Sequence, residues 1–168
     1  MNSEFLINIA RFFVLILMQV AIFNNVLLFG YINPYPYILF IILYPVNANR
    51  YGFIFLSFLL GLTIDMFSNS GGIHATSCLI LAYNKTHIVK LSFGLSSEYQ
   101  TLKVQYSSLK EQLLFVSFSV FIHHLILFSL EAFRFSLIGN VLLKVLLSSI
   151  FTVIFSVLII NLFKSSKK

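Results

Sequence analysis

The chain has 168 residues, of which 59% are hydrophobic and only 10% are charged, and its mean hydropathy is +0.96. Soluble domains carry roughly 25% charged residues. The chain therefore has too little polar surface for a water-soluble globular enzyme or a disordered chain. Its single cysteine, Cys78, cannot form an internal disulfide, which excludes a disulfide-stabilised scaffold. The composition predicts an all-α polytopic membrane protein with one transmembrane domain over residues 1–168.

Five long apolar runs and one shorter run are candidates for membrane helices, since a helix needs about 20 mostly apolar residues to cross the hydrocarbon core. The predicted spans cover residues 5–29, 31–46, 51–67, 73–91, 113–133 and 137–163. The second span is the weakest because it holds Pro34, Pro36 and Pro45, and proline kinks or ends a helix. We expect a short, broken or tilted helix there, with a re-entrant segment as the alternative. Bundles of six spans and of five spans both fit this pattern.

The net charge of +6 follows from the membrane topology, so affinity for nucleic acid is not needed to explain it. With six spans, most basic residues fall on one side of the membrane. Arg11 lies near the N-terminus and Arg50 in a loop. The long loop before the fifth span is taken to hold Lys85, Lys90, Lys103 and Lys110, and the C-terminal tail holds Lys164, Lys167 and Lys168. Only Arg134, close to Glu131, falls on the other side. The positive-inside rule then predicts that both termini are cytoplasmic, with some attraction to anionic membrane lipids.

The predicted cytoplasmic loop over residues 93–112 carries an apolar stripe. Its residues step by four and three positions, as on one face of a helix: Leu95, Tyr99, Leu102, Tyr106 and Leu109. The spacing predicts an amphipathic helix that runs into the fifth span. Such a helix could lie on the lipid headgroups or offer its stripe to a partner helix. The pattern leaves both alternatives open.

Asp65 is the most informative polar residue, because an ionisable group at membrane depth is costly. Ser57, Gly61 and Asp65 recur every four residues, so they share one helix face, and small residues there let another helix approach closely. Gly71 and Gly72 follow and permit a tight turn. We expect this face to pack inward and Asp65 to brace the turn by accepting backbone N–H bonds. A proton or ion relay and a direct partner contact are the alternatives.

Polar residues also punctuate the last two spans. Glu131 and Lys144 lie near the short loop between two antiparallel helices, so they are expected to pair. Lys144, Ser148, Thr152 and Ser156 form a stripe with a step of four residues. Serine and threonine in membrane helices usually bond to the backbone or to another helix. The stripe is therefore interpreted as internal bundle contacts, and a transport path is the alternative.

The histidines do not indicate a metal site. His123 and His124 are adjacent, so on a helix they point about 100° apart and cannot chelate one ion together. The sequence offers no cysteine cluster, phosphate-binding loop or set of nucleophile, base and oxyanion donor. We therefore expect no metal, no cofactor and no enzymatic activity.

Two stretches of the chain resemble the family of rod shape-determining protein MreD. The first runs from Gln19 to Gly30 and continues over Pro34 to Pro45. The second is Gly61-Leu62-Thr63-Ile64-Asp65-Met66-Phe67, followed by Gly72-Ile73-His74-Ala75. It is similar to the family's Gly-Leu-x-x-Asp segment at the end of a membrane helix, with a glycine–apolar–x–Ala restart.

The resemblance implies a non-enzymatic, multi-pass protein of the bacterial inner membrane that supports rod shape and lateral peptidoglycan synthesis. Its implied partners are an MreC-like bitopic membrane protein, the actin-like MreB, RodA and a class B penicillin-binding protein. The implied fold is similar to the substrate-binding subunits of energy-coupling-factor transporters. That similarity and the polar stripes motivate the alternative function, a small-molecule-binding membrane subunit of a transporter.

Overall fold

The computed structural model describes residues 3–26, 32–94, 102–133 and 138–163, which form α-helices and short 3-10 helices. The α-helices are α1 (Ser3–Ala21), α2 (Leu39–Leu43), α3 (Arg50–Ser68), α4 (Ile73–Phe93), α5 (Leu109–Ala132) and α6 (Ile138–Leu162). The 3-10 helices are η1 (Phe23–Asn25), η2 (Pro36–Ile38) and η4 (Val104–Tyr106). The predicted all-α class is confirmed.

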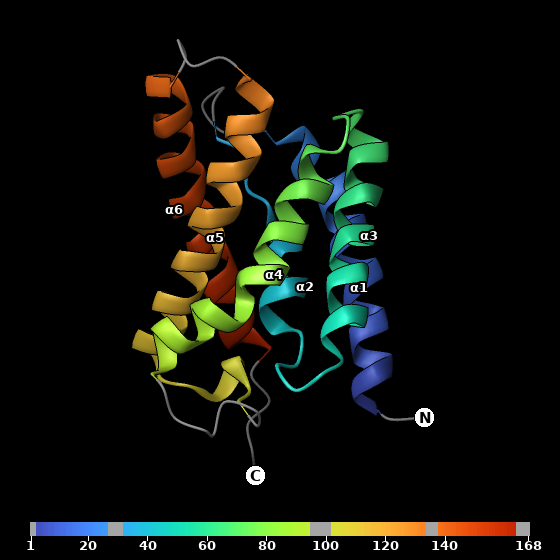
Figure 1. The fold of residues 1–168 in the computed structure, drawn as a ribbon, viewed down its shortest axis with the longest axis vertical. Helices are drawn as coiled ribbons and strands as arrows, with labels where there is room; N and C mark the ends of the chain where they lie inside the picture. Colours follow the sequence, from blue (N-terminus) through green and yellow to red (C-terminus); the bar gives the residue numbers. More distant parts are fainter. Residues whose placement is uncertain (1–2, 27–31, 95–101, 134–137, 164–168) are drawn as a thin grey trace.

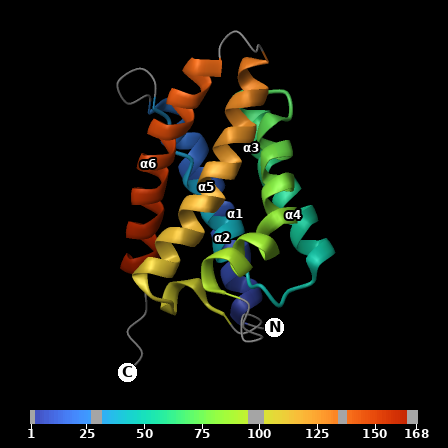
Figure 2. The ribbon, with the colours of Figure 1, turned by 60° about the vertical axis from the view of Figure 1, so that its left-hand side comes forward.

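The long helices run up and down the molecule, and α3, α4, α5 and α6 each pack against the next along the chain (Figure 1). α1 packs against α3 and against the short α2 segment. One end of the bundle holds the starts of α1 and α3 and the last residues of α4 and α6. We call it the basic end. The opposite end, at which α3 and α5 end, is called the Asp65 end. The start of α1 and the end of α6 lie at the same end, as an even number of crossings requires (Figure 2).

Among the residues that the structure describes, four helical stretches are long and apolar enough to cross a membrane. They are Leu6–Asn25, Arg50–Ser68, Leu109–Ala132 and Ile138–Leu162. Their outward faces expose large hydrophobic side chains, such as Leu17 at 65%, Phe55 at 60% and Leu158 at 63%. An exposed apolar surface of this extent needs lipid or a partner to cover it. The bundle is therefore a membrane protein.

The predicted spans over residues 31–46 and 73–91 are not among these four. The second of them does form a helix, the 21-residue α4, but its sequence is more polar and includes Lys85 and Lys90. The first has regular helix only in η2 and α2. The expectation of a short, broken helix is correct for this segment, and the re-entrant segment stays the alternative. Asn33 lies at the Asp65 end beside Ser68, and Tyr44 lies at the basic end beside Arg11.

This broken segment is the centre of the bundle. Ile38, Leu39, Phe40, Ile41 and Ile42 are each at most 1% exposed. A helix of five residues leaves most of its backbone polar groups without partners along the chain, which is tolerated at membrane depth only where neighbours satisfy them.

Side chains from α5 and α6 form hydrogen bonds with polar groups in the first part of the broken segment. The backbone N–H of Asn33 donates to Ser148 Oγ at 3.4 Å, and that of Tyr35 donates to Thr152 Oγ1 at 3.2 Å. The Tyr37 hydroxyl lies 2.9 Å from His123 Nε2. Two residues of the polar stripe on α6 therefore bond to the broken segment, as the interpretation of internal bundle contacts expects.

Two cations satisfy the carbonyls at the end of α2. Lys85 Nζ donates to the carbonyl oxygens of Ile41 at 2.8 Å and Tyr44 at 2.5 Å. Arg11 Nη1 donates to the carbonyl oxygen of Leu43 at 3.3 Å. A cation near the C-terminus of a helix is stabilising, because that end of the helix dipole is negative. The placement of Lys85 in a cytoplasmic loop was wrong, because Lys85 lies within α4 and is only 5% exposed.

We expect Lys85→Met to lower the free energy of unfolding by roughly 2–4 kcal/mol, because it leaves two buried carbonyls without their donor. Thermal melting of the detergent-purified protein measures the effect. Lys90→Met is the matched control, since Lys90 lies in the last turn of the same helix and is only partly buried. Equal melting temperatures for the two variants would remove this role from Lys85.

The predicted continuous amphipathic helix over residues 93–112 is wrong for residues 102–108, and only its last part, from Leu109 on, belongs to α5. Leu102 precedes the 3-10 helix η4, which ends at Tyr106, and α5 begins only at Leu109. Ser108 and Glu111 form a capping box that starts α5. A capping box fixes a helix start because each side chain satisfies a backbone N–H of the first turn. Leu95 and Tyr99 lie outside the described residues, as do Arg134, Lys164, Lys167 and Lys168.

Candidate functional site

The turn between α3 and α4 positions the polar residues of the Asp65 end. Asn69 ends α3 in a left-handed conformation with φ 51°, and its backbone N–H donates to the Asp65 carbonyl. Gly71 and Gly72 follow with φ 68° and 95°. Glycine adopts positive φ at little cost, because it has no Cβ to clash with its own backbone. The expected tight turn at these two glycines is therefore present.

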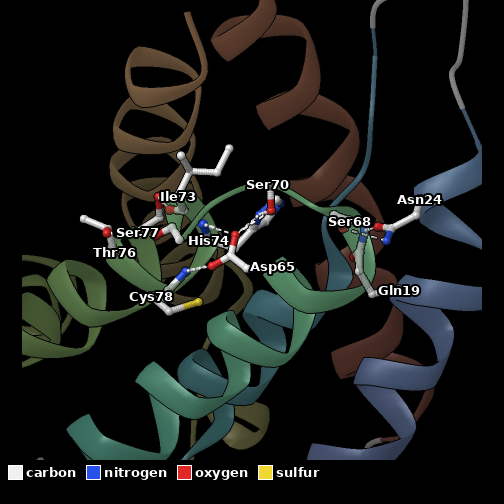
Figure 3. Close-up of polar contacts among 12 residues, drawn as sticks. Gln19, Asn24, Asp65, Ser68, Ser70, Ile73, His74, Thr76, Ser77 and Cys78 are labelled. Atoms are coloured by element: carbon white, nitrogen blue, oxygen red, sulfur yellow. Dashed lines mark hydrogen bonds and ion pairs between the residues drawn. The ribbon is translucent and has the colours of Figure 1, made fainter. Parts of the chain in front are cut away.

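The Asp65 carboxylate caps α4 from the preceding helix. Its Oδ1 accepts the backbone N–H of His74 at 3.1 Å, and its Oδ2 accepts that of Ala75 at 2.8 Å (Figure 3). The N-cap residue of α4, Gly72, has no side chain with which to do this. The first N–H groups of a helix need such acceptors, and a carboxylate also suits the positive end of the dipole. The bracing role expected of Asp65 is confirmed.

Two further polar side chains meet Asp65. Ser70 Oγ donates to Asp65 Oδ1 at 2.5 Å, and His74 Nδ1 lies 3.0 Å from the same oxygen. The side chains of Asp65 and His74 are only 5% and 7% exposed. Sequence reasoning did not pair these two residues. A spacing of nine residues across a tight glycine turn is the signal that could have found the pair.

Gly61 brings α3 and α4 into backbone contact. A Cβ added at Gly61 would lie 2.5 Å from Ala75 Cα and from the His74 carbonyl oxygen. Ser57, Gly61 and Asp65 are all buried, so the face predicted to pack inward does so. Ser57 donates to the Phe53 carbonyl of its own helix at 2.8 Å. The close approach at Gly61 is what places Asp65 beside the first turn of α4.

A second polar chain links α1 to α3 at the same end. Gln19 Nε2 donates to Asn24 Oδ1 at 3.0 Å, and Asn24 Nδ2 donates to Ser68 Oγ at 2.9 Å (Figure 3). A cavity of about 520 Å³ opens beside these residues. Polar members of its lining come from four segments: Asn24, Asn25, Asn33, Tyr35, Ser68, Ser70, His74 and Glu131.

The expected pair between α5 and α6 is present. Lys144 Nζ donates to both carboxylate oxygens of Glu131, at 2.9 and 2.8 Å. The ammonium also lies 4.7 Å from the centre of the Phe128 ring. The Glu131 and Lys144 side chains are 46% and 32% exposed, so this pair contributes little to stability. Glu131 is a lining residue of the cavity, whereas Lys144 is not.

The site is suited to hydrogen bonding and to rigid packing. Within the described ranges, no three His, Cys, Asp or Glu side chains are grouped as around a metal ion. Cys78 lies 3.9 Å from His123 Nε2 in the bundle interior, away from the cavity lining. The groups that reach the cavity are amides, hydroxyls, one imidazole and one carboxylate.

No protein-family model, curated protein or solved structure matches the chain significantly. The family resemblance therefore rests on the sequence motifs alone.

Proposed function

We propose that this chain is a non-enzymatic scaffold of the bacterial elongation machinery, similar to the MreD family. In this proposal it lies in the inner membrane and supports rod shape and lateral peptidoglycan synthesis. It captures an MreC-like bitopic membrane protein, and MreB, RodA and a class B penicillin-binding protein belong to the same assembly. Helices that pack through small residues and buried polar bonds are suited to hold a partner-binding surface in a rigid shape.

One observation supports the proposal above the others: the residues that carry the resemblance form a single structural unit. Gly61 lets the Ala75 backbone approach, and the Asp65 carboxylate accepts the Ala75 N–H. Gly72 supplies the positive φ of the turn between them. One set of contacts thus explains the glycine, aspartate, glycine and alanine of the motif. These contacts hold the end of the α3–α4 hairpin in a fixed shape.

The geometry also indicates which side chains are available to contact a partner. Asp65 is 5% exposed and fully engaged with its own chain, so it acts by bracing the turn and not by direct contact. The neighbouring side chains of Met66 and Phe67 are 78% and 65% exposed. Exposed apolar residues in the last turn of a braced helix are suited to anchor a partner helix. We therefore place the partner contact at Met66 and Phe67.

The variant Met66→Ala/Phe67→Ala tests this placement. We expect about a tenfold loss of MreC-like partner recovered with the tagged chain, and rounded cells, because two anchor side chains are removed. The melting temperature should not change, since both side chains are exposed. Leu162→Ala is the matched control, because Leu162 is 79% exposed at the basic end. Normal rods and full partner recovery with the double variant would contradict the placement.

The cavity of about 520 Å³ at the Asp65 end favours a second candidate, a transporter subunit that binds a small molecule. Its volume lies in the range of small-molecule pockets. Its amides, hydroxyls and imidazole would suit a neutral polar ligand. Ligand-dependent thermal stabilisation of the purified protein, together with recovery of an ATPase module from native membranes, would favour this candidate over the scaffold.

A further inference from the structure

A separate cavity of about 310 Å³ lies at the basic end of the bundle. Three segments form it: the first half of α1, the chain that follows α2, and residues 102–105 before α5. Arg11 and Lys103 line it together with the amide side chains of Asn8, Asn47 and Gln105. The described residues that line it include no aspartate or glutamate. Two cationic side chains and three amides therefore contribute to the described lining of the cavity.

Arg11 is held toward this cavity by neutral partners. Its Nη1 donates to Asn8 Oδ1 at 3.0 Å and to the Leu43 carbonyl at 3.3 Å. A guanidinium has five N–H donors in a planar fork that matches the oxygens of a phosphate. Both of these bonds go to uncharged oxygens, so neither compensates the positive charge that Arg11 brings to the cavity.

The cavity also adjoins an apolar surface. Ile7, Arg11 and Val14 lie on one face of α1, since they are four and three residues apart. Ile7 and Val14 are 53% and 51% exposed, and Ile7 lines the cavity itself. A ligand that enters the cavity with a charged group could thus lay an apolar chain along α1. A free anion would make no use of that surface.

We propose that this cavity binds the phosphate of an anionic phospholipid, with an acyl chain lying along the Ile7–Val14 face of α1. Basic pockets between membrane helices bind anionic lipid headgroups in this way, because the cations compensate the phosphate charge close to the membrane surface. A zwitterionic headgroup carries an ammonium that Arg11 and Lys103 would repel. The site is distinct from the Asp65 end and does not depend on the proposed scaffold function.

The test titrates phosphatidylglycerol and phosphatidylcholine into the detergent-purified full chain and follows its melting temperature. We expect stabilisation by phosphatidylglycerol and none by phosphatidylcholine. Arg11→Gln should raise the half-saturating phosphatidylglycerol concentration about fivefold, the effect of one basic residue near an anionic surface. Arg50→Gln is the matched control, because Arg50 begins α3 at the same end, where it lies 5.2 Å from the Tyr83 ring centre, and does not line the cavity.

A second variant keeps the test decisive if Arg11→Gln loosens α2. Lys103→Gln leaves the bond from Arg11 to Leu43 intact and should weaken phosphatidylglycerol binding by a similar factor. Unchanged half-saturation in both variants would overturn the site. Equal stabilisation by phosphatidylcholine would overturn the selectivity for an anionic headgroup. Full stabilisation by glycerol phosphate alone would overturn the lipid as the source of the phosphate.

Discussion

Gly61→Val will lower the free energy of unfolding by at least about 3 kcal/mol, the upper range for overpacked interiors. The added Cβ would lie 2.5 Å from Ala75 Cα and from the His74 carbonyl oxygen. Both are backbone atoms of a neighbouring helix, so no rotamer change can relieve the contact. α3 and α4 must move apart, and that movement also withdraws Asp65 from the first turn of α4. Thermal melting of the detergent-purified protein measures the loss.

Gly139→Val is the matched control for this substitution. Gly139 lies in α6, and a Cβ added there meets nothing within 4 Å. We expect its melting temperature to equal or slightly exceed that of the unmodified chain, because glycine is a poor helix former. If Gly61→Val melted like Gly139→Val, the two helices would not be in backbone contact at Gly61.

Asp65→Ala is expected to cost roughly 2–4 kcal/mol of unfolding free energy. It removes the acceptor for the backbone N–H groups of His74 and Ala75 and for the Ser70 hydroxyl. Loss of a helix cap alone costs about 1 kcal/mol, and each buried donor left unsatisfied costs about 1–3 kcal/mol. Asp65→Asn should lose less, because its amide keeps one acceptor oxygen. Melting temperature and amide hydrogen exchange at His74 and Ala75 measure these effects.

Glu131→Ala is the control for removal of a carboxylate at the same end of the bundle. Its pair with Lys144 is partly exposed, so we expect a cost below about 1 kcal/mol. Faster exchange of the His74 and Ala75 amides should occur in Asp65→Ala and not in Glu131→Ala. Unchanged exchange in Asp65→Ala would show that another group caps α4.

The parts of the site that follow from local spacing could be predicted from the sequence. Ser57, Gly61 and Asp65 share a face because their spacing is close to the helical period, and the two glycines mark the turn. The same reasoning pairs residues on either side of a short turn between antiparallel helices. It therefore found the contact of Glu131 with Lys144.

The contacts of the broken segment could not be predicted, because they join residues far apart in the chain. The sequence pattern predicts Lys85 as a loop charge, because a lysine at membrane depth is costly unless a partner compensates it. Its actual role depends on the free carbonyls at the end of α2, 41 and 44 residues earlier in the chain. The prediction of a continuous helix before α5 failed for a different reason. The apolar stripe alone predicts one continuous helix, whereas the capping box of Ser108 and Glu111 starts a new helix within it.

Identification of partners tests the central claim of a cell-shape scaffold most directly. The tagged, unmodified chain is purified from native membranes in mild detergent, and the co-purifying proteins are identified by mass spectrometry. The proposal predicts recovery of an MreC-like bitopic protein together with wall-synthesis proteins. Recovery of an ATPase module without any wall-synthesis protein would contradict it.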